Sequence, residues 1–343
     1  MTRRDLLAYS AFATAAVAPA QTRDSLIKPK VLQAGDTVAL ITPATSVVDP
    51  DSRETAERTV RYFGLKPKWG KNANKKRGYA GGTIDERLED LHAAFSDPEA
   101  NAVFPVRGGY ASGHLLDRID YDLIRRNPKV FLGYSDITAM HLAIARKVGM
   151  VTFHGPTMLS GFTDYTIENL KRALFDKQPL GALTNPAEAN ALRPRHKLRT
   201  IRGGRASGRL IGGNLSLILA TMGTPFEIDT RGKIFFIEDV EEQPYSVDRM
   251  LTNLRLAGKL QAAAGIVFGE CADCTPRDYK PSFVTGTLVL SEVLDDILGG
   301  LKIPVLTGLT IGHTSDQLTL PVGCMATLDA DKQQLIVEES AFQ

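Results

Sequence analysis

The sequence contains few of the residue types that build several common kinds of functional site. Its three cysteines in 343 residues exclude a small scaffold held together by disulfides. It has one tryptophan, and aromatic residues make up 7% of the chain, so a large sugar-stacking platform is not expected. Basic residues number 41 and acidic residues 39, and the net charge of +2 argues against nucleic acid as a partner.

Several sequence motifs are also missing. After the first twenty residues no apolar run approaches the roughly 18 residues that span a bilayer, so no stable membrane anchor is expected. The sequence has no H-E-x-x-H, G-x-G-x-x-G or P-loop motif. Cys271 and Cys274 have C-x-x-C spacing without further ligands nearby, so neither a metal nor a cofactor is predicted. A strained disulfide in an exported chain is the other interpretation, and the role of the pair stays open here.

The first twenty residues have the form of a secretory signal peptide. Arg3 and Arg4 precede a small-residue apolar stretch, and the Ala-Pro-Ala sequence at 18–20 resembles a cleavage site that would leave Gln21 first. Paired arginines favour the twin-arginine type of signal, which carries folded cargo. A frayed amphipathic helix is the alternative. We expect an exported protein, periplasmic in a cell with two membranes.

The remaining chain alternates between strand and helix patterns, which predicts an α/β fold with a largely parallel sheet. We expect an N-terminal domain over 31–160, a proline-punctuated connection over 161–207 and a second α/β domain over 208–340. The expected strands of the first domain are 37–42, 102–106, 130–133 and one beginning at 151. Its expected helices are 51–63, 85–96 and 137–147.

Ser135 lies between a predicted strand and a predicted helix, two residues after a glycine. That arrangement is typical of a nucleophile elbow, in which a tight turn exposes a hydroxyl at the edge of a sheet. Ser135 could equally cap the following helix. Gly109, in the sequence Arg-Gly-Gly-Tyr, and the backbone of Asp136 are candidates for an oxyanion hole. A simple tight turn is the alternative interpretation of the two glycines.

Two further segments carry candidate catalytic groups. Glu238 and Asp239 follow a buried strand pattern and can orient a histidine, although a solvated strand end or a pair with Arg249 explains them as well. His313 follows a glycine in a polar loop, and His154 is its rival as a general base. The glycine-rich stretch 208–216 fits either an anion-binding turn or the entry turn of the second domain.

Five segments together resemble the serine LD-carboxypeptidases, also called murein tetrapeptide carboxypeptidases. They read RGGYASGHLLDRID, FLGYSDITAMHLA, SGRLIGGNLSLI, FFIEDVEEQPYSVDRML and GHTSDQLTLPVG. The likeness runs in order from about residue 31 to residue 338. It implies a flavodoxin-like or glutamine-amidotransferase-like N-terminal domain and a C-terminal α/β domain similar to a swivelling β-barrel.

The resemblance also implies a catalytic set. Ser135 would be the nucleophile, with Glu238 and His313 from the second domain and the oxyanion hole near Gly109 and Asp136. It implies a metal-free homodimer that removes terminal D-alanine from murein peptides. A related branch hydrolyses microcin-type aminoacyl nucleotides, for which Trp69 and Tyr279 are the candidate base-stacking residues. A non-catalytic muropeptide binder of the same fold is a further alternative.

Overall fold

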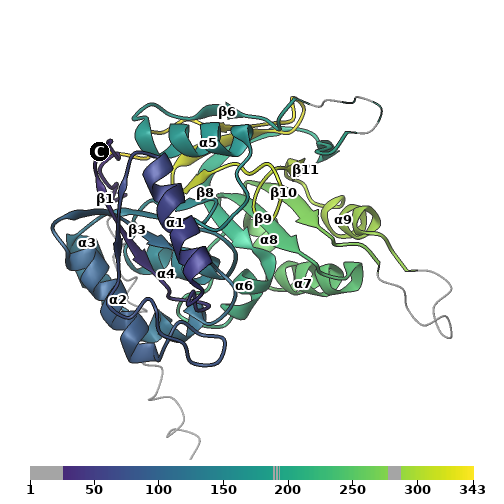
Figure 1. Cartoon of the computed structure of the whole chain (residues 1–343). Coiled ribbons are helices and arrows are strands. Elements are labelled where there is room, and N and C mark those ends of the chain that lie inside the picture. The colour runs from purple at the N-terminus through teal and green to yellow at the C-terminus, as the bar shows by residue number, and fades with distance from the viewer. Residues whose placement is uncertain (1–25, 188–189, 191, 193, 277–286) are drawn as a thin grey trace, which may run out of the picture.

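The computed structural model describes residues 26–187, 190, 192, 194–276 and 287–343 (Figure 1). The predicted signal peptide therefore lies outside the described residues. Within the described part of the chain, no helix is both long enough and apolar enough to cross a membrane.

The first sheet has five parallel strands and one antiparallel edge strand in the order β12-β5-β4-β3-β1-β2. The order of the five parallel strands is that of flavodoxin-like folds. The strands are β1 (Thr37–Ile41), β2 (Lys66–Trp69), β3 (Ala100–Pro105), β4 (Val130–Gly133), β5 (Thr152–His154) and β12 (Leu320–Val322). In such a sheet, ligands bind outside the carboxyl ends of the strands, where the order reverses between β1 and β3.

Four helices connect the strands of this first sheet. They are α1 (Pro50–Tyr62), α2 (Ile84–Ser96), α3 (Tyr121–Arg126) and α4 (Thr138–Lys147). Local signals fix where two of them begin. Asp49 caps α1 ahead of Pro50, and Thr83 and Glu86 form a reciprocal capping box on α2. The first helix therefore begins just after the carboxyl end of β1 and beside the expected ligand site.

The second sheet has eight strands in the order β6-β14-β13-β8-β9-β10-β11-β7. Its central strands are parallel, and the flanking strands are antiparallel. The strands are β6 (Gly181–Leu183), β7 (Arg199–Arg202), β8 (Arg205–Asn214), β9 (Ile234–Val240), β10 (Gly265–Ala272), β11 (Val305–Leu309), β13 (Met325–Asp329) and β14 (Gln334–Val337). The remaining helices are α5 (Asp164–Phe175), α6 (Leu215–Ala220), α7 (Pro244–Leu256), α8 (Lys259–Ala262) and α9 (Leu290–Leu298).

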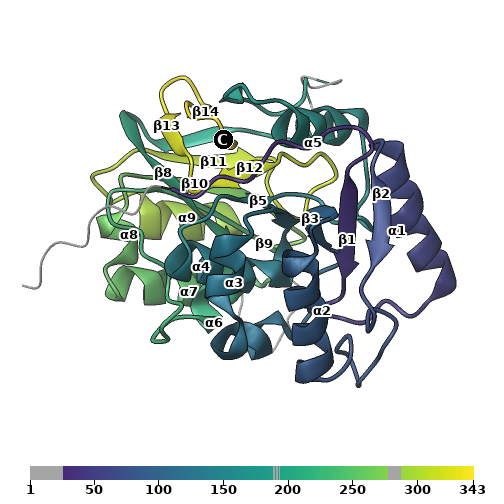
Figure 2. The same ribbon diagram turned by 90° about the vertical axis from the view of Figure 1, so that its left-hand side faces the viewer.

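The two sheets share one hydrophobic core. A single cluster of buried side chains includes Leu40 and Phe104 of the first sheet and Phe235 and Val267 of the second. Strand β12, from the second half of the chain, pairs with β5 and completes the first sheet (Figure 2). Figure 1 shows α1 to α4 gathered around the first sheet, with α7 and α9 on the far side of the second. The two halves are therefore joined by packing and by strand pairing.

The α/β class and the parallel first sheet are confirmed, and two local expectations need correction. Residues 161–207, expected as a connection, form α5, β6 and β7, and both strands pair at the edges of the second sheet. The stretch 208–216 is neither an anion-binding turn nor an entry turn, because most of it belongs to β8. Gly212 is needed there because a Cβ would overlap the Phe236 carbonyl on the neighbouring strand.

Candidate active site

Ser135 lies in the sharp turn between β4 and α4. All four residues of β4 are buried, so the strand is fixed in the core and delivers Ser135 to the carboxyl edge of the sheet. The serine has φ +63°, a left-handed conformation that a non-glycine residue adopts at a cost of roughly 1–3 kcal/mol. Gly133 lets Ile137 pack close, since a Cβ would lie 2.9 Å from Ile137 Cγ2. This is the geometry of a nucleophile elbow.

The loop after β3 lies directly against this turn. A Cβ on Gly108 would come within 2.7 Å of Ser135 Cβ and 3.2 Å of the Asp136 backbone nitrogen, so only glycine leaves room there. Gly109 has φ +99°, and a Cβ on it would overlap Thr45 Oγ1. The Gly109 N–H donates to no other described residue. Both glycines are thus required by close approach. The sequence indicated Gly109 as a candidate, whereas the packing role of Gly108 could be found only from the structure.

The Asp136 side chain has a structural role. Its carboxylate accepts a 2.8 Å hydrogen bond from the Ser112 N–H, and its carbonyl accepts a 2.6 Å bond from the Ser112 hydroxyl. Burial raises the pKa of Asp136, although the bonds from Ser112 and the nearby charges of His114 and Arg87 oppose that shift. These contacts hold the Ser135–Asp136 turn against the segment that follows Gly109.

Glu238 and His313 form a hydrogen-bonded pair. Glu238 lies on β9 with its side chain fully buried, and His313 follows β11 in the loop that leads to β12. His313 Nδ1 is 2.8 Å from Glu238 Oε2, and the His313 backbone N–H donates to the same oxygen at 3.2 Å. Since Nδ1 carries the proton in this bond, Nε2 of the neutral ring is left as the acceptor.

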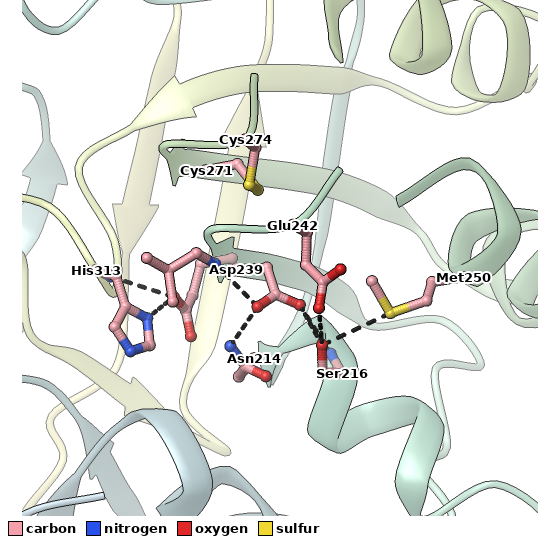
Figure 3. Close-up of a disulfide and its surroundings, with 10 residues drawn as sticks. Asn214, Ser216, Asp239, Glu242, Met250, Cys271, Cys274 and His313 are labelled. Carbon is pink, nitrogen blue, oxygen red and sulfur yellow. Dashed lines mark hydrogen bonds and ion pairs between the residues drawn. A yellow bond between two sulfur atoms is a disulfide. The ribbon is translucent and has the colours of Figure 1, made fainter. Parts of the chain in front are cut away.

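The carboxylate next to Glu238 points to the opposite face of the strand. Asp239 accepts hydrogen bonds from the Asn214 side chain and from the N–H and hydroxyl of Ser216, at 2.8–3.0 Å. Figure 3 shows these contacts, with Asp239 turned away from His313. Alternation along a strand therefore assigns Glu238 to the histidine and Asp239 to the start of α6. Neither carboxylate pairs with Arg249 among the described contacts, and the Arg249 guanidinium lies 5.4 Å from the centre of the Tyr245 ring.

Ser135 and His313 line one cavity of about 650 Å³. Its walls come from the segments that follow β1, β3, β4 and β5, together with the His313 loop. Gly108, Gly109 and Arg107 also line it, and the ring of Tyr134 lies 4.7 Å from that of His313. Among the described contacts no hydrogen bond joins Ser135 to His313. Such bonds are often long without substrate. The cavity occupies the ligand position expected for this strand order.

Two opposing effects set the protonation of His313. Burial lowers its pKa, but the hydrogen bond and charge of Glu238 outweigh burial, with Asp239 and Glu241 adding to them. The pKa of His313 is therefore raised above its ordinary value. The ring is a stronger proton acceptor than a free imidazole, and its charged form is stabilised.

His154 does not line the cavity. Its Nε2 lies 4.0 Å from Glu238 Oε1, and the side chain is fully buried. Burial lowers the pKa of His154 well below the usual range, and the neighbouring His141 and His313 add to this. A neutral, enclosed imidazole fits poorly as a general base for a hydroxyl in the cavity. The ring of Tyr134, which the sequence did not indicate, lies 6.3 Å from that of His154 and 4.7 Å from that of His313.

The loop that carries His313 is fixed by several contacts. A Cβ on Gly312 would overlap Glu238 Oε2, and Gly312 has φ +79°. The Gln317 side-chain amide donates to the Gly312 carbonyl at 2.6 Å. His196 joins Glu270 on β10 to Asp316 in this loop, at 2.7 and 2.9 Å. Thr314 also donates to Glu270. His196 lies in the stretch 161–207 that was expected as a connection, and the sequence gave no sign of this contact.

The remaining candidates lie apart from the cavity. Trp69 donates a 2.8 Å hydrogen bond to Glu57 and stacks under Arg53, and Tyr279 lies outside the described residues. Cys271 and Cys274 form a disulfide at the end of β10, which the sequence had left open (Figure 3). No group of three or more metal-ligating side chains gathers within the described ranges.

Comparison with known proteins now identifies the family. Residues 38–155 match the LD-carboxypeptidase N-terminal domain, and residues 207–328 match the LD-carboxypeptidase C-terminal domain. A probable murein peptide carboxypeptidase of Bacillus subtilis is 41% identical over 311 residues, which cover 91% of this chain and 94% of that protein. The chain belongs to the LD-carboxypeptidase family. The resemblance inferred from the five sequence segments is confirmed.

Solved structures of LD-carboxypeptidase relatives agree with the fold. The microcin C7 self-immunity protein MccF in complex with glutamyl sulfamoyl guanosine has a TM-score of 0.81 at 29% identity, covering 92% of this chain and 100% of that one. A muramoyltetrapeptide carboxypeptidase from Oxalobacter formigenes has a TM-score of 0.74 at 27% identity, covering 89% and 99%. This LD-carboxypeptidase therefore has structural relatives in both branches of the family.

Proposed function

We propose that this chain is a serine LD-carboxypeptidase that hydrolyses the L–D peptide bond before the terminal D-alanine of murein tetrapeptides. The observation that carries the proposal is the hydrogen bond between buried Glu238 and His313, which lines a cavity together with Ser135 in its strained turn. The relatives from Bacillus subtilis and Oxalobacter formigenes support the substrate class.

In the proposed reaction the Ser135 hydroxyl attacks the scissile carbonyl carbon while His313 Nε2 accepts its proton. Glu238 holds the ring through Nδ1 and stabilises the imidazolium that forms. The N–H groups of Gly109 and Asp136 stabilise the oxyanion of the tetrahedral intermediate. His313 then returns the proton to the nitrogen of the departing D-alanine, leaving an acyl-Ser135. A water molecule, deprotonated by His313, hydrolyses this ester and regenerates the serine.

The direct test is mass spectrometry for D-alanine released from a purified murein tetrapeptide. We expect stoichiometric D-alanine and tripeptide with the intact protein, and loss of essentially all turnover with Ser135→Ala. A Ser135→Ala protein that is folded and turns over at the original rate would contradict the mechanism. An intact protein that releases no D-alanine would contradict the substrate assignment.

A second candidate function is hydrolysis of aminoacyl nucleotides. The likeness to MccF bound to glutamyl sulfamoyl guanosine favours it. The neutral side chains in the described cavity wall include Tyr134 and Leu159, but not Trp69. Comparing kcat/KM for a murein tetrapeptide and for an aminoacyl sulfamoyl-adenosine separates the two candidates. We expect kcat/KM for the preferred substrate to be higher by at least about tenfold.

The proposal includes export through a twin-arginine signal and assembly as a homodimer. The Cys271–Cys274 disulfide supports export, because disulfides persist mainly in oxidising compartments. Mass spectrometry of the protein recovered from its native cell should find a mature N-terminus near Gln21 outside the cytoplasm. Full-length protein confined to the cytosol would contradict export. Sedimentation at micromolar concentration should give twice the monomer mass if the homodimer forms.

A further inference from the structure

The charged groups around the cavity are few. Apart from His313, the side chains lining it include one carboxylate, Asp51, and one guanidinium, Arg107. Arg107 is exposed and makes no ion pair or hydrogen bond with another described residue. By contrast, Arg87 donates to three backbone carbonyls and Arg53 lies over Trp69. Arg107 is thus a cation at the cavity that the fold itself does not use.

The backbone holds Arg107 close to the nucleophile. Its neighbour Gly108 packs so tightly on the elbow that a Cβ would lie 2.7 Å from Ser135 Cβ. Consecutive Cα atoms are about 3.8 Å apart, so the Cα atom of Arg107 lies about 3.8 Å from that of Gly108, the residue that packs on the elbow. The carboxylate of a one-residue leaving group lies about one residue length, at most roughly 3.6 Å, beyond the scissile bond. An arginine side chain rooted there can reach a carboxylate at that distance.

The basic residues around the start of β7 face a different cavity. Arg195, Lys197 and Arg199 line it together with Glu270 and Asp295, and Ser135 is absent from its wall. Arg199 pairs with Asp295 at 2.6 Å, and Arg195 donates to Ser315 at 2.8 Å. Among the described residues, these three cations therefore line a cavity other than that of Ser135, and they are not candidates to bind a substrate carboxylate beside it.

We propose that Arg107 binds the terminal carboxylate of the substrate and so restricts cleavage to the last peptide bond. This inference rests on the proposed function, since it assigns a specificity residue to that reaction. A guanidinium can form two parallel hydrogen bonds to a carboxylate, which fixes the leaving residue in one orientation. A peptide that continued beyond one residue would place its carboxylate out of reach and its uncharged amide against Arg107.

The test compares two substrates and three variants. The substrates are a murein tetrapeptide ending in D-alanine and the same peptide with its terminal carboxylate converted to an amide. We expect Arg107→Gln to lower kcat/KM on the acid by about 10- to 100-fold, mainly through KM, and to change the amide rate by less than about threefold. Arg107→Lys should fall between, because it keeps charge without the fork of donors. Arg77→Gln, an exposed arginine outside the cavity wall, is the charge-matched control and should leave both rates unchanged.

Two kinetic outcomes would overturn the inference. One is an Arg107→Gln enzyme that keeps its rate on the acid. The other is an equal loss of kcat/KM on the acid and on the amide, which would show that Arg107 only supports the loop containing Gly108 and Gly109.

Calorimetry on the Ser135→Ala background separates this inference from the proposed function. Adding Arg107→Gln should weaken binding of the acid by a similar factor and leave binding of the amide unchanged. If the intact protein releases no D-alanine, the proposed function fails. The calorimetry then tests by itself whether Arg107 binds the terminal carboxylate. An unchanged affinity for the acid would refute it.

Discussion

At the scale of single residues, the site depends on side chains held in costly or enclosed positions. Ser135 adopts a left-handed backbone that serine disfavours, and Glu238 places a carboxylate entirely inside the protein. Each is stable only because its surroundings fix it: the core strand β4 for Ser135, and His313 for Glu238. Changes at these two residues should therefore separate activity from stability.

Ser135→Gly should abolish turnover and still give a more stable protein than Ser135→Ala. Glycine accepts φ +63° without the steric cost that alanine keeps, a difference of about 1 kcal/mol. Thermal unfolding of the two inactive variants, measured side by side, checks this. A lower melting temperature for the glycine variant would mean that the turn is not strained in solution.

Glu238→Gln should lower kcat by roughly 10³–10⁴-fold, because an amide fixes the ring poorly and does not stabilise the imidazolium. The pKa of His313 is raised, so kcat/KM of the intact enzyme should fall as the pH drops through that raised value and the base becomes protonated. In the variant, the pKa of His313 should be lower, so the residual activity should fall at a lower pH than in the intact enzyme. An unmoved pH profile would show that Glu238 does not control this titration.

How far the sequence predicted the site depends on the range of the contacts. Ser135 could be recognised locally, since a glycine, a buried strand and a helix surround it. Glu238 could not be separated from Asp239 by pattern alone, because the two carboxylates are adjacent at the end of the same strand. The choice depended on family resemblance, and the structure adds the alternation that sends the two side chains to opposite faces. Tyr134 and His196 gave no signal, since their partners are distant in sequence.

At the scale of elements, the His313 loop joins two strands that belong to different sheets. It leaves β11 in the second sheet and enters β12 in the first. Gly312 fits it against Glu238, and His196 anchors it to β10. The position of the imidazole is thus set by the loop as a unit.

Gly312→Ala should lower kcat at least tenfold and destabilise the protein by about 1–3 kcal/mol. The new methyl group overlaps the Glu238 carboxylate, and alanine resists φ +79°. Gly300→Ala is the control, because nothing lies within 4 Å of its Cβ position and its φ is not in the left-handed region. Equal behaviour of the two variants in turnover and urea unfolding would contradict this role.

His196→Gln should destabilise the protein by about 1–3 kcal/mol in mildly acidic solution, and less at higher pH. Burial lowers the pKa of His196, but the bonds and charges of Glu270 and Asp316 outweigh it and raise the pKa. A raised pKa means that this stabilisation is fully present below the unfolded-state pKa and is lost as pH rises through the folded-state value. Urea unfolding of both proteins across that range measures it. A difference that grows with pH would refute the bridge.

The strands that the sequence predicted well are the buried central ones, such as β4. Edge strands were missed because their patterns are weak. Strand β2 reads Lys-Pro-Lys-Trp and is half exposed, and β6 and β12 have three residues each. The prolines of 161–207 suggested a connection, yet prolines are also common between short edge strands. Only tertiary pairing decides such cases.

At the scale of the whole molecule, the two halves share a core, and one strand of the second half completes the sheet of the first. Strand β12 belongs to the second half by sequence and to the first sheet by pairing. Ser135 and His313, the proposed nucleophile and base, come from opposite halves and line one cavity. Rigid-body separation of the halves would break the β5–β12 ladder, so the cavity should open through its rim loops.

Hydrogen exchange should therefore find the β5–β12 ladder among the slowest parts of the protein. The amides of its paired residues, such as His154 and Leu320, should exchange at rates similar to those of the β9–β10 ladder, because opening either requires disruption of the common core. Mass spectrometry of peptic fragments gives the rates. Early exchange confined to β12 would mean that the halves can part.

The position of β12 also matters during synthesis. A ribosome-bound chain that stops before residue 313 already contains the serine turn and the carboxylate, but it lacks the imidazole and leaves the outer edge of β5 bare. Under the proposed mechanism, such a chain has no general base for Ser135, and the unpaired edge of β5 can pair with other strands until β12 forms.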